Sequence, residues 1–364
     1  MLSQCGFGGE GSGFHEQPAH SDAGFEPVPA EAPPDVHQPI MLASGQRYPS
    51  AIAVDGSNVY WINLGIDDTT NTKAPKPWHS GAVMKCAIRG CNQLPTPLAT
   101  RRGTSPNTRL PQALAADGTY VYWSDLEDPT YGDWVFGIFR CAAHGCNDEP
   151  ERIMPWAASG IAIHKQRLFW TGGSGEASSC RVTGCQVPAQ TYYGQDSALS
   201  FGIAVDDSGV YWIGAPRDQL FHSRQDAGGG SATRLNPLDT YTAGLYQLAI
   251  DSRQVYFADS SPIGLGKILR CPKTGCDGEP TVLAAGLSSV SAIASDGDDV
   301  FWVEAGEKVV DDHIERGRGY LRKCAGLSSL CEPTTLANGA NTLAVDSHFV
   351  YWTTGSGEVW MAPK

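Results

Sequence analysis

The sequence predicts an all-β protein, a seven-bladed β-propeller of four-stranded antiparallel blades. Two observations predict this fold. A ten-residue pattern occurs seven times at intervals of about 50 residues, and the last repeat lacks a strand that the N-terminal part of the chain can supply. The copies are IAVDGSNVYW (52–61), LAADGTYVYW (114–123), IAIHKQRLFW (161–170), IAVDDSGVYW (203–212), LAIDSRQVYF (248–257), IASDGDDVFW (293–302) and LAVDSHFVYW (343–352).

Each repeat begins as a hairpin of two strands. In residues 52–61 the apolar run IAV precedes the turn DGSN and the aromatic run VYW, and Asp and Gly suit tight turns. A third apolar run follows, such as GAVMKC at 81–86, and then a fourth, such as PTPLAT at 95–100. Four strands per repeat, arranged radially, form one propeller blade.

An acidic residue precedes the first turn in six repeats, and His164 takes its place in the third. A ring of ligands around a channel is one interpretation of these residues. We favour turn capping, because Asp side chains accept hydrogen bonds from the backbone of the following residues. The six acidic residues are Asp55, Asp117, Asp206, Asp251, Asp296 and Asp346.

The ends of the chain predict how the propeller closes. The last repeat ends with GEVWMAPK at 357–364, after three strands, and QPIMLASG at 38–45 is similar to the fourth-strand segment EPTVLAAG at 279–286. We therefore expect the N-terminal strand to complete the last blade, which removes an open sheet edge. The propeller then occupies residues 38–364.

The pattern IAVD…VYW resembles the YWTD repeat of LDL-receptor-type propellers and, more loosely, the TolB-like propellers of bacteria. The resemblance covers roughly residues 38–364 and implies a propeller. It departs from those families in two respects. YWSD at 122–125 approximates the full motif, and seven repeats occur where six blades are usual.

Ten of the eleven cysteines form five pairs that flank the turn between the third and fourth strands. We expect disulfides, because facing residues of an antiparallel hairpin lie within disulfide range; zinc sites and free thiols are the alternatives. The fourth repeat has HSRQDAGGG instead, which we interpret as a flexible turn. Disulfides indicate an oxidising compartment. The pairs are Cys86/Cys91, Cys141/Cys146, Cys180/Cys185, Cys271/Cys276 and Cys324/Cys331.

Residues 1–37 are rich in Gly, Pro and Glu and show no strand or helix periodicity, so we expect a disordered tether. LSQC at 2–5 partly resembles a bacterial lipobox. A lipid on Cys5 would anchor the tether to a membrane, although the few residues before Cys5 would then require a longer precursor. The alternative is a free thiol on the tail.

Composition excludes some functions. A net charge of −13 argues against nucleic acid as a partner, because binding phosphates requires clustered Lys and Arg. The sequence contains no apolar run of about 18 residues that would span a membrane.

The longest connections predict the binding face. Connections from the second to the third strand and from one blade to the next lie on the same face, and long loops on a rigid scaffold are typical binding elements. Segments 62–80, 124–136 and 303–319 are of the first kind, and 100–112 and 236–246 of the second. Solvated acidic residues and packed aromatic rings are the alternative interpretation. The candidate partner-binding residues are Asp67, Asp68, Trp78, Asp125, Asp128, Tyr131, Trp134, Asp312 and His313.

These features favour a monomeric, non-catalytic binding or scaffold protein of a bacterial cell envelope, with an envelope protein or a glycan as its partner. An extracytoplasmic hydrolase or lyase with its site in the central channel is the alternative, and a purely structural surface protein is a third. No G-x-S-x-G elbow or H-E-x-x-H motif is in place. We expect no cofactor; Ca²⁺ would suit the acidic loops, but no calcium-loop motif occurs.

Overall fold

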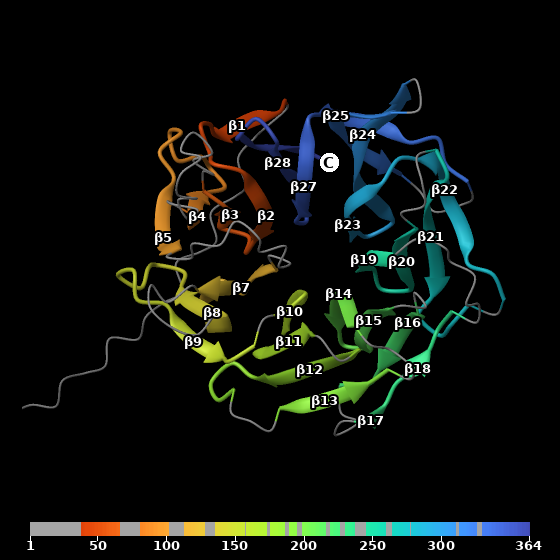
Figure 1. The fold of residues 1–364 in the computed structure, drawn as a ribbon, viewed down its shortest axis with the longest axis horizontal. Coiled ribbons are helices and arrows are strands. Elements are labelled where there is room, and N and C mark those ends of the chain that lie inside the picture. Colours follow the sequence, from red (N-terminus) through yellow and green to blue (C-terminus); the bar gives the residue numbers. More distant parts are fainter. Residues whose placement is uncertain are drawn as a thin grey trace, which may run out of the picture. The chain divides into compact units, whose positions relative to one another are not determined.

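Figure 1 shows the fold of the chain in a computed structural model. The chain divides into two units, Met1–Pro33 and Pro34–Lys364, and all described residues belong to the second. The structure describes residues 38–65, 81–101, 113–127, 135–156, 158–172, 175–185, 189–194, 199–215, 219–225, 230–236, 245–259, 264–276, 278–310, 313–325 and 330–364. The predicted tether and Cys5 lie outside these ranges.

The described strands form seven sheets, and each sheet corresponds to one sequence repeat. Blade 1 contains β2 (Pro49–Val54), β3 (Asn58–Asn63), β4 (Gly81–Ala87) and β5 (Thr96–Arg101). Blade 2 contains β6 (Leu114–Ala116), β7 (Tyr120–Glu127), β8 (Val135–Ala142) and β9 (Glu151–Met154). Blade 3 contains β10 (Gly160–His164), β11 (Arg167–Thr171), β12 (Glu176–Arg181) and β13 (Gln190–Tyr193). Blade 4 contains β14 (Leu199–Asp206), β15 (Gly209–Ala215), β16 (Gln219–Ser223) and β18 (Thr233–Arg234).

The remaining three blades follow the same order. Blade 5 contains β19 (Leu245–Ile250), β20 (Gln254–Asp259), β21 (Gly266–Pro272) and β22 (Thr281–Leu287). Blade 6 contains β23 (Val290–Asp296), β24 (Asp299–Val310), β25 (His313–Cys324) and β26 (Thr334–Asn338). Blade 7 contains β27 (Ala340–Val345), β28 (Phe349–Thr354), β29 (Val359–Pro363) and, at its edge, β1 (Ile40–Ala43).

The blades surround a common axis. Their first strands, β2, β6, β10, β14, β19, β23 and β27, contact one another in this order, and β27 contacts β2 again (Figure 1). The ring is closed by β1, which pairs with β29 so that Ile40 faces Met361 and Met41 faces Trp360. The predicted seven-bladed propeller and its N-terminal closing strand are confirmed.

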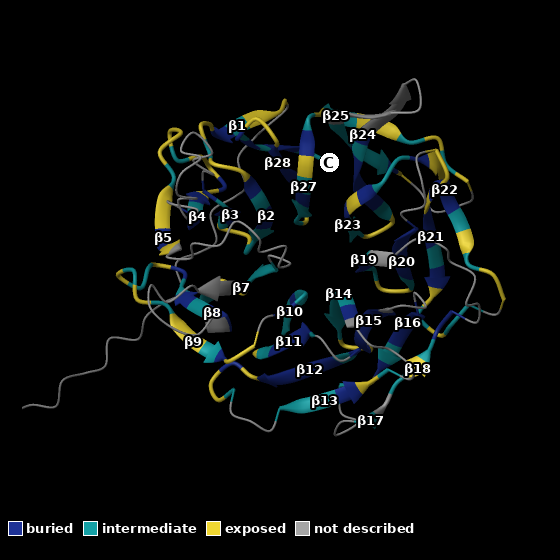
Figure 2. Cartoon of the chain, viewed as in Figure 1, coloured by how far each residue is buried: buried dark blue, intermediate teal, exposed yellow. Residues whose placement is uncertain are grey.

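Among the described residues, the core forms seven apolar clusters, and each cluster fills the space between two neighbouring blades. Trp61 packs with Tyr351 of blade 7, whereas the adjacent Tyr60 packs with Trp123 of blade 2. Successive residues of a strand point to opposite faces of the sheet, so VYW supplies both neighbouring clusters. Figure 2 shows the buried residues along the inner strands and the exposed ones in the turns and on outer strands such as β5.

All five predicted disulfides form, with Cα–Cα distances between 5.0 and 6.3 Å. Their predicted geometry is wrong in one respect, because the two cysteines of a pair do not face each other across paired strands. The first cysteine of each pair is buried and lies in the third strand, whereas the second is half-buried and lies in the connection, before the fourth strand begins. The second cysteines, which are in no strand, are Cys91, Cys146, Cys185, Cys276 and Cys331.

A tight turn between the cysteines is the physical reason for this difference. In blade 1 the backbone N–H of Gly90 donates to the Ala87 carbonyl at 2.8 Å, and in blade 2 that of Gly145 donates to Ala142 at 2.8 Å. Each turn reverses the chain directly after the third strand, which brings the residue after the glycine back beside the first cysteine. The disulfide therefore closes the turn itself rather than joining the third strand to the fourth.

The connections that contain these disulfides also contact the preceding blade; we call them cystine hairpins. The backbone N–H of Cys276 donates to Leu235 of blade 4 at 3.0 Å, and that of Cys331 donates to Leu283 of blade 5 at 2.8 Å. Each of these two cystine hairpins therefore joins neighbouring blades as well as closing its own turn.

Blade 4 has no cystine, and the middle of its predicted flexible turn, residues 226–229, lies outside the description. Directly after these residues, β17 (Gly230–Ser231) pairs in parallel with β13 of blade 3. Ala232 then donates its N–H to the Tyr193 carbonyl at 2.9 Å. This strand joins blade 4 to the preceding blade, as the cystine hairpins do elsewhere.

Among the residues that the structure describes, no helix has the length and apolar character needed to cross a membrane.

Candidate functional site

The strand register defines two faces of the propeller. Pro49 faces Asn63, Asn63 faces Ala82 and Gly81 faces Arg101, so the second-to-third connections share a face with the connections between blades. We call this the long-loop face. The opposite face, which carries the Asp turns and the cystine hairpins, is called the cystine face. The predicted grouping of the long connections on one face is therefore correct.

The paired cysteines are structural and lie away from the candidate site. Cys91, Cys146 and Cys185 belong to connections of the cystine face, and each is bonded to the cysteine five residues before it. No described cysteine lines the two cavities of the long-loop face that are described below.

Most predicted partner-binding residues lie outside the described residues. These are Asp67, Asp68, Trp78, Asp128, Tyr131, Trp134 and Asp312. Asp125 lies in β7 opposite Gly137, and His313 lies in β25 opposite Val310, so these two occupy blades 2 and 6, which are not neighbours.

The segment 303–319 differs from its prediction as a loop. It extends blade 6 into a long hairpin, paired from Gly306 with Gly317 to Val310 with His313. Residues 311–312 at its tip lie outside the description.

The channel mouth on the long-loop face is a cavity of about 400 Å³ that first strands of all seven blades line. Its polar lining residues are Ser50, Ser159, Gln247, Ser291, Asn341 and Thr342, and the remainder are Ala, Gly, Ile and Leu. Several polar groups already join strands or blades. Asn341 donates to the Pro49 carbonyl at 3.0 Å, and Ser291 donates to the Asn341 carbonyl at 3.0 Å. None of the described lining residues is titratable.

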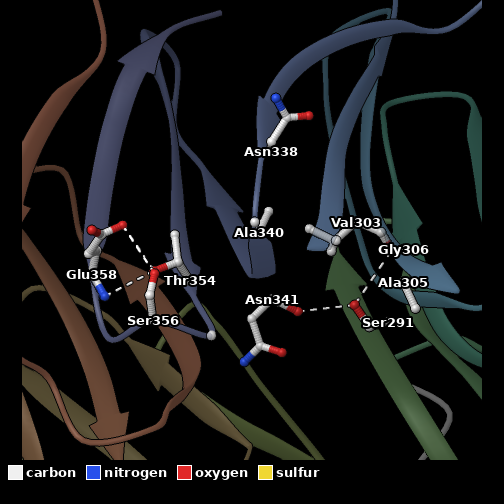
Figure 3. A pocket seen from close by; sticks show the side chains of 13 residues that line it. Ser291, Val303, Ala305, Gly306, Asn338, Ala340, Asn341, Thr354, Ser356 and Glu358 are labelled. Atoms are coloured by element: carbon white, nitrogen blue, oxygen red, sulfur yellow. Dashed lines mark hydrogen bonds between the residues drawn. The ribbon is translucent and has the colours of Figure 1, made fainter. Parts of the chain in front are cut away.

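A second cavity lies between blades 6 and 7 on the same face. We call it the seam pocket; its volume is about 670 Å³. It shares Ser291 and Asn341 with the channel mouth, so the two cavities adjoin. The connection between β28 and β29 is only residues 355–358, and this short turn leaves the space open beside the long β24–β25 hairpin. Figure 3 shows the pocket with Thr354, Ser356 and Glu358 on one wall, Ser291, Val303 and Ala305 on the other, and Asn338, Ala340 and Asn341 between them.

Glu358 is the charged residue of the seam pocket. Its Oε2 accepts hydrogen bonds from Thr354 Oγ1 at 3.2 Å, Ser356 Oγ at 3.4 Å and Trp360 Nε1 at 3.1 Å. Its backbone N–H donates to Thr354 Oγ1 at 3.0 Å, which fixes the turn. Within the described part of the chain, Oε1 has no hydrogen-bond or ion-pair partner.

On the cystine face, the predicted turn capping is confirmed for five of the six motif Asp residues, namely Asp55, Asp117, Asp206, Asp251 and Asp346. Asp55 Oδ1 accepts from the backbone N–H of Ser57 at 2.9 Å and of Asn58 at 2.8 Å, and Tyr60 donates its hydroxyl to Oδ2 at 2.6 Å. Burial, followed by the hydrogen bond and the charge of Asp55, raises the pKa of Tyr60 well above its ordinary value. The same arrangement holds for Asp117 with Tyr122, Asp251 with Tyr256 and Asp346 with Tyr351.

In blades 4 and 6, a lysine side chain pairs with Oδ2 of the motif Asp. Asp206 Oδ2 pairs with Lys273 of blade 5, and Asp296 pairs with the C-terminal residue Lys364. Burial alone would raise the pKa of Asp206, but the hydrogen bonds from Lys273 and Ser208 outweigh it and hold the pKa below the ordinary value. In blade 3, His164 Nε2 lies 2.6 Å from Asp207 of blade 4. The structure describes no group of three or more His, Cys, Asp or Glu placed to hold a metal ion.

Sequence reasoning missed the seam pocket. Its signal was the short connection TGSGE at 354–358, which follows the long segment 303–319 of the preceding blade. A short turn beside a long hairpin leaves a hollow, and attention to long loops alone passes over it.

No protein-family model and no curated protein matches the chain. Virginiamycin B lyase from Staphylococcus aureus is similar in structure, at a TM-score of 0.57 and 14% identity, over 89% of this chain and 97% of the lyase chain. The WD40 β-propeller domain of Doa1 aligns at a TM-score of 0.57 and 13% identity, over 89% and 96% of the two chains. A nidogen/laminin complex aligns at a TM-score of 0.46 and 18% identity, over 68% and 87%, so the YWTD assignment stays a prediction. At these identities the likeness concerns the fold, and the chain is similar to β-propellers that include both a lyase and a WD40 domain.

Proposed function

We propose that this protein is a non-catalytic binding propeller of a bacterial cell envelope, which docks a protein or glycan partner on its long-loop face. A lipid on Cys5 would tether it through residues 1–37. The disulfides support an oxidising compartment, because such bonds persist outside the reducing cytosol.

The observation that carries the proposal is the chemistry of the channel mouth. Its described lining consists of hydroxyl, amide and aliphatic groups, and several of the polar ones already join strands or blades. General acid–base catalysis requires a titratable group within hydrogen-bond reach of the substrate. These lining residues supply none, so the alternative of a channel hydrolase or lyase would depend on titratable groups outside this lining.

Exposed apolar side chains on the long-loop face also support docking. Tyr48 is 59% exposed, Trp156 is 44% exposed and Leu265 is 63% exposed, and all three lie in connections on that face. Aromatic side chains are enriched where proteins bind partners. Leu94 and Leu330 are exposed on the cystine face, which provides a matched control surface.

The test is cross-linking in the cells that produce the protein, followed by mass spectrometry. Three forms are compared: wild type, Tyr48→Ser/Trp156→Ser, and Leu94→Ser/Leu330→Ser. We expect a partner that both the wild type and the cystine-face variant retain and that the long-loop variant loses. A partner lost only with the cystine-face variant would contradict the proposal.

A second pair of changes tests the loops outside the described residues. Tyr131→Ala/Trp134→Ala should also reduce cross-linking, because the sequence predicts both residues to belong to the binding face. If every partner persists in this variant and in Tyr48→Ser/Trp156→Ser, the long-loop face is not the docking surface. A metal or small molecule retained on purification, together with activity on a substrate panel, would favour the channel enzyme instead.

A further inference from the structure

We propose that the seam pocket binds a cationic side chain, lysine or arginine, of a protein partner. This inference rests on the proposed function, since it names the group through which a partner on the long-loop face is held. Glu358 is the charged residue among the 13 that line the pocket. These 13 described residues include no lysine, arginine or histidine, so the lining leaves the carboxylate without a compensating cation.

The carboxylate of Glu358 is held in position before any ligand arrives. Donors from Thr354, Ser356 and Trp360 all reach Oε2, and the turn is closed by the bond from Gly357 N–H to the Thr354 carbonyl at 3.1 Å. The other oxygen, Oε1, is the one left for a ligand. A fixed acceptor loses little conformational freedom on binding, and a charge-assisted hydrogen bond to it is stronger than a neutral one.

Amide groups complement the carboxylate. Asn341 uses its Nδ2 on the Pro49 carbonyl at 3.0 Å, which leaves Oδ1 as an acceptor, and exposed Asn338 lies on the same lining. An ammonium group has three N–H donors and a guanidinium has five, and neither has an acceptor. A pocket whose ionic group is an acceptor and whose amide oxygen is unused therefore suits a cation.

The size and the walls of the pocket also suit such a side chain. Its volume of about 670 Å³ lies within the range of about 300–1,000 Å³ typical of ligand pockets. Val303, Ala305 and Ala340 provide methyl groups for the aliphatic stem, which lysine and arginine commonly pack against apolar surface. The net charge of −13 would steer a basic partner toward the protein at long range.

Trp360 provides a specific readout, because its indole N–H donates to the same carboxylate. The full chain, labelled with ¹⁵N, is titrated with acetyl-Gly-Lys-Gly-amide and acetyl-Gly-Arg-Gly-amide, and the indole resonance is assigned with Trp360→Phe. Acetyl-Gly-Gln-Gly-amide is the uncharged control peptide, and a chitooligosaccharide tests a glycan occupant. We expect a saturable shift of the Trp360 resonance with the two cationic peptides alone.

Variants separate charge from shape. Glu358→Gln should weaken binding at least tenfold, whereas Glu149→Gln, which removes one exposed charge from the cystine face, should leave it unchanged. Gly355→Leu keeps the carboxylate and fills the pocket, since a Cβ at Gly355 meets nothing within 4 Å, and it should also abolish the shift. It therefore tests the proposal even if Glu358→Gln fails to fold.

Three results would overturn the inference: no saturable shift with either cationic peptide, an equal shift with the glutamine peptide, or a shift with the chitooligosaccharide alone. If the peptides fail while cross-linking still depends on the long-loop face, only the cationic anchor is wrong. If the peptides bind while cross-linking does not depend on that face, the seam pocket binds cations but the proposed docking function is wrong.

Discussion

The free energy of the hydrogen bond between the motif Asp and Tyr can be measured in blade 7 by a double-mutant cycle on Asp346 and Tyr351. The Tyr351 ring is fully buried, and its hydroxyl donates to Asp346 Oδ2 at 2.7 Å. A hydrogen bond to a charged group stabilises a protein by about 1.5–3 kcal/mol. We therefore expect Tyr351→Phe to lower the free energy of unfolding by about this amount.

Asp346→Ala should lower the free energy of unfolding more than Tyr351→Phe does, because Asp346 Oδ1 also accepts from the backbone N–H of His348 and of Phe349, each at 2.8 Å. Each of these hydrogen bonds contributes about 0.5–1.5 kcal/mol, so losing both adds about 1 kcal/mol or more to the destabilisation. In this background Tyr351→Phe should cost much less, since its hydroxyl has lost its partner. The coupling free energy between the two changes should be about 1.5–3 kcal/mol.

The assay is urea denaturation without reductant, followed by both tryptophan fluorescence and circular dichroism, whose transitions must coincide for a two-state analysis. Tyr192→Phe is the matched control. Tyr192 is equally buried, but its hydroxyl meets the neutral Ser179 Oγ and the Gln225 carbonyl, each at 3.3 Å, so its loss should cost about 1 kcal/mol. A coupling below about 0.5 kcal/mol would refute the idea that the Asp–Tyr pair stabilises the blade.

Four further predictions concern other parts of the fold. The pKa of Asp206 is lowered in the folded state, so its ion pair with Lys273 stabilises the fold fully at pH values above the unfolded pKa of about 4. This stabilisation is lost as the pH falls through the folded pKa. The difference in unfolding free energy between wild type and Lys273→Met should therefore shrink in acid. Gly319→Ala should destabilise by about 1–3 kcal/mol, because a Cβ there lies 2.0 Å from the Ala340 carbonyl oxygen, whereas Gly355→Ala should stay within about 0.5 kcal/mol; equal denaturation midpoints would contradict this. Deleting residues 38–44 removes β1 and exposes the edge of β29, so light scattering should show association that the intact chain lacks. Reducing the five disulfides should lower the melting temperature steeply, at about 2 kcal/mol for each small loop, and an unchanged melting curve after complete thiol titration would count against their role.

The features that the sequence predicts correctly depend on local pattern. The blade count, the Asp caps and the cysteine pairing each involve residues a few positions apart, repeated often enough to be recognised. The closing strand joins distant residues, but its similarity to other fourth strands reveals it. The pattern did not show where the fourth strand begins, so Cys91, Cys146 and Cys185 were expected to face their partners across paired strands, whereas they lie in the turns.

One strand and the extension of one hairpin were missed because their residues carry no strand signal. Gly230 and Ser231 of β17 have no strand propensity, and they pair only because β13 of the neighbouring blade offers a free edge. Six of the twelve residues of segment 306–317 are Asp, Glu, Lys or Arg, and the segment lacks the apolar alternation by which a strand is predicted. Its described residues nevertheless continue the pairing that the inner parts of β24 and β25 begin.

The seam pocket could not be predicted either. Ser356 and Trp360 both donate to the Glu358 carboxylate where the turn enters β29, but only the packing of blade 6 against blade 7 makes a cavity beside them. A hollow between two blades depends on the relative lengths of their connections, and no single segment of the sequence contains that information.

The contrast between the two faces links stability to the proposed function. On the cystine face, several charged groups have structural partners: five motif Asp residues cap turns, and Lys273 and Lys364 join neighbouring blades. Cystine hairpins of that face also reach the preceding blade. A carboxylate used in this way has little left to offer a ligand. Glu358 differs, because its donors occupy one oxygen and the other meets a cavity without a cation among its described lining. A carboxylate that is held in place through one oxygen and keeps the other open to a cavity can bind a ligand, so partner recognition should be tested first at the seam pocket.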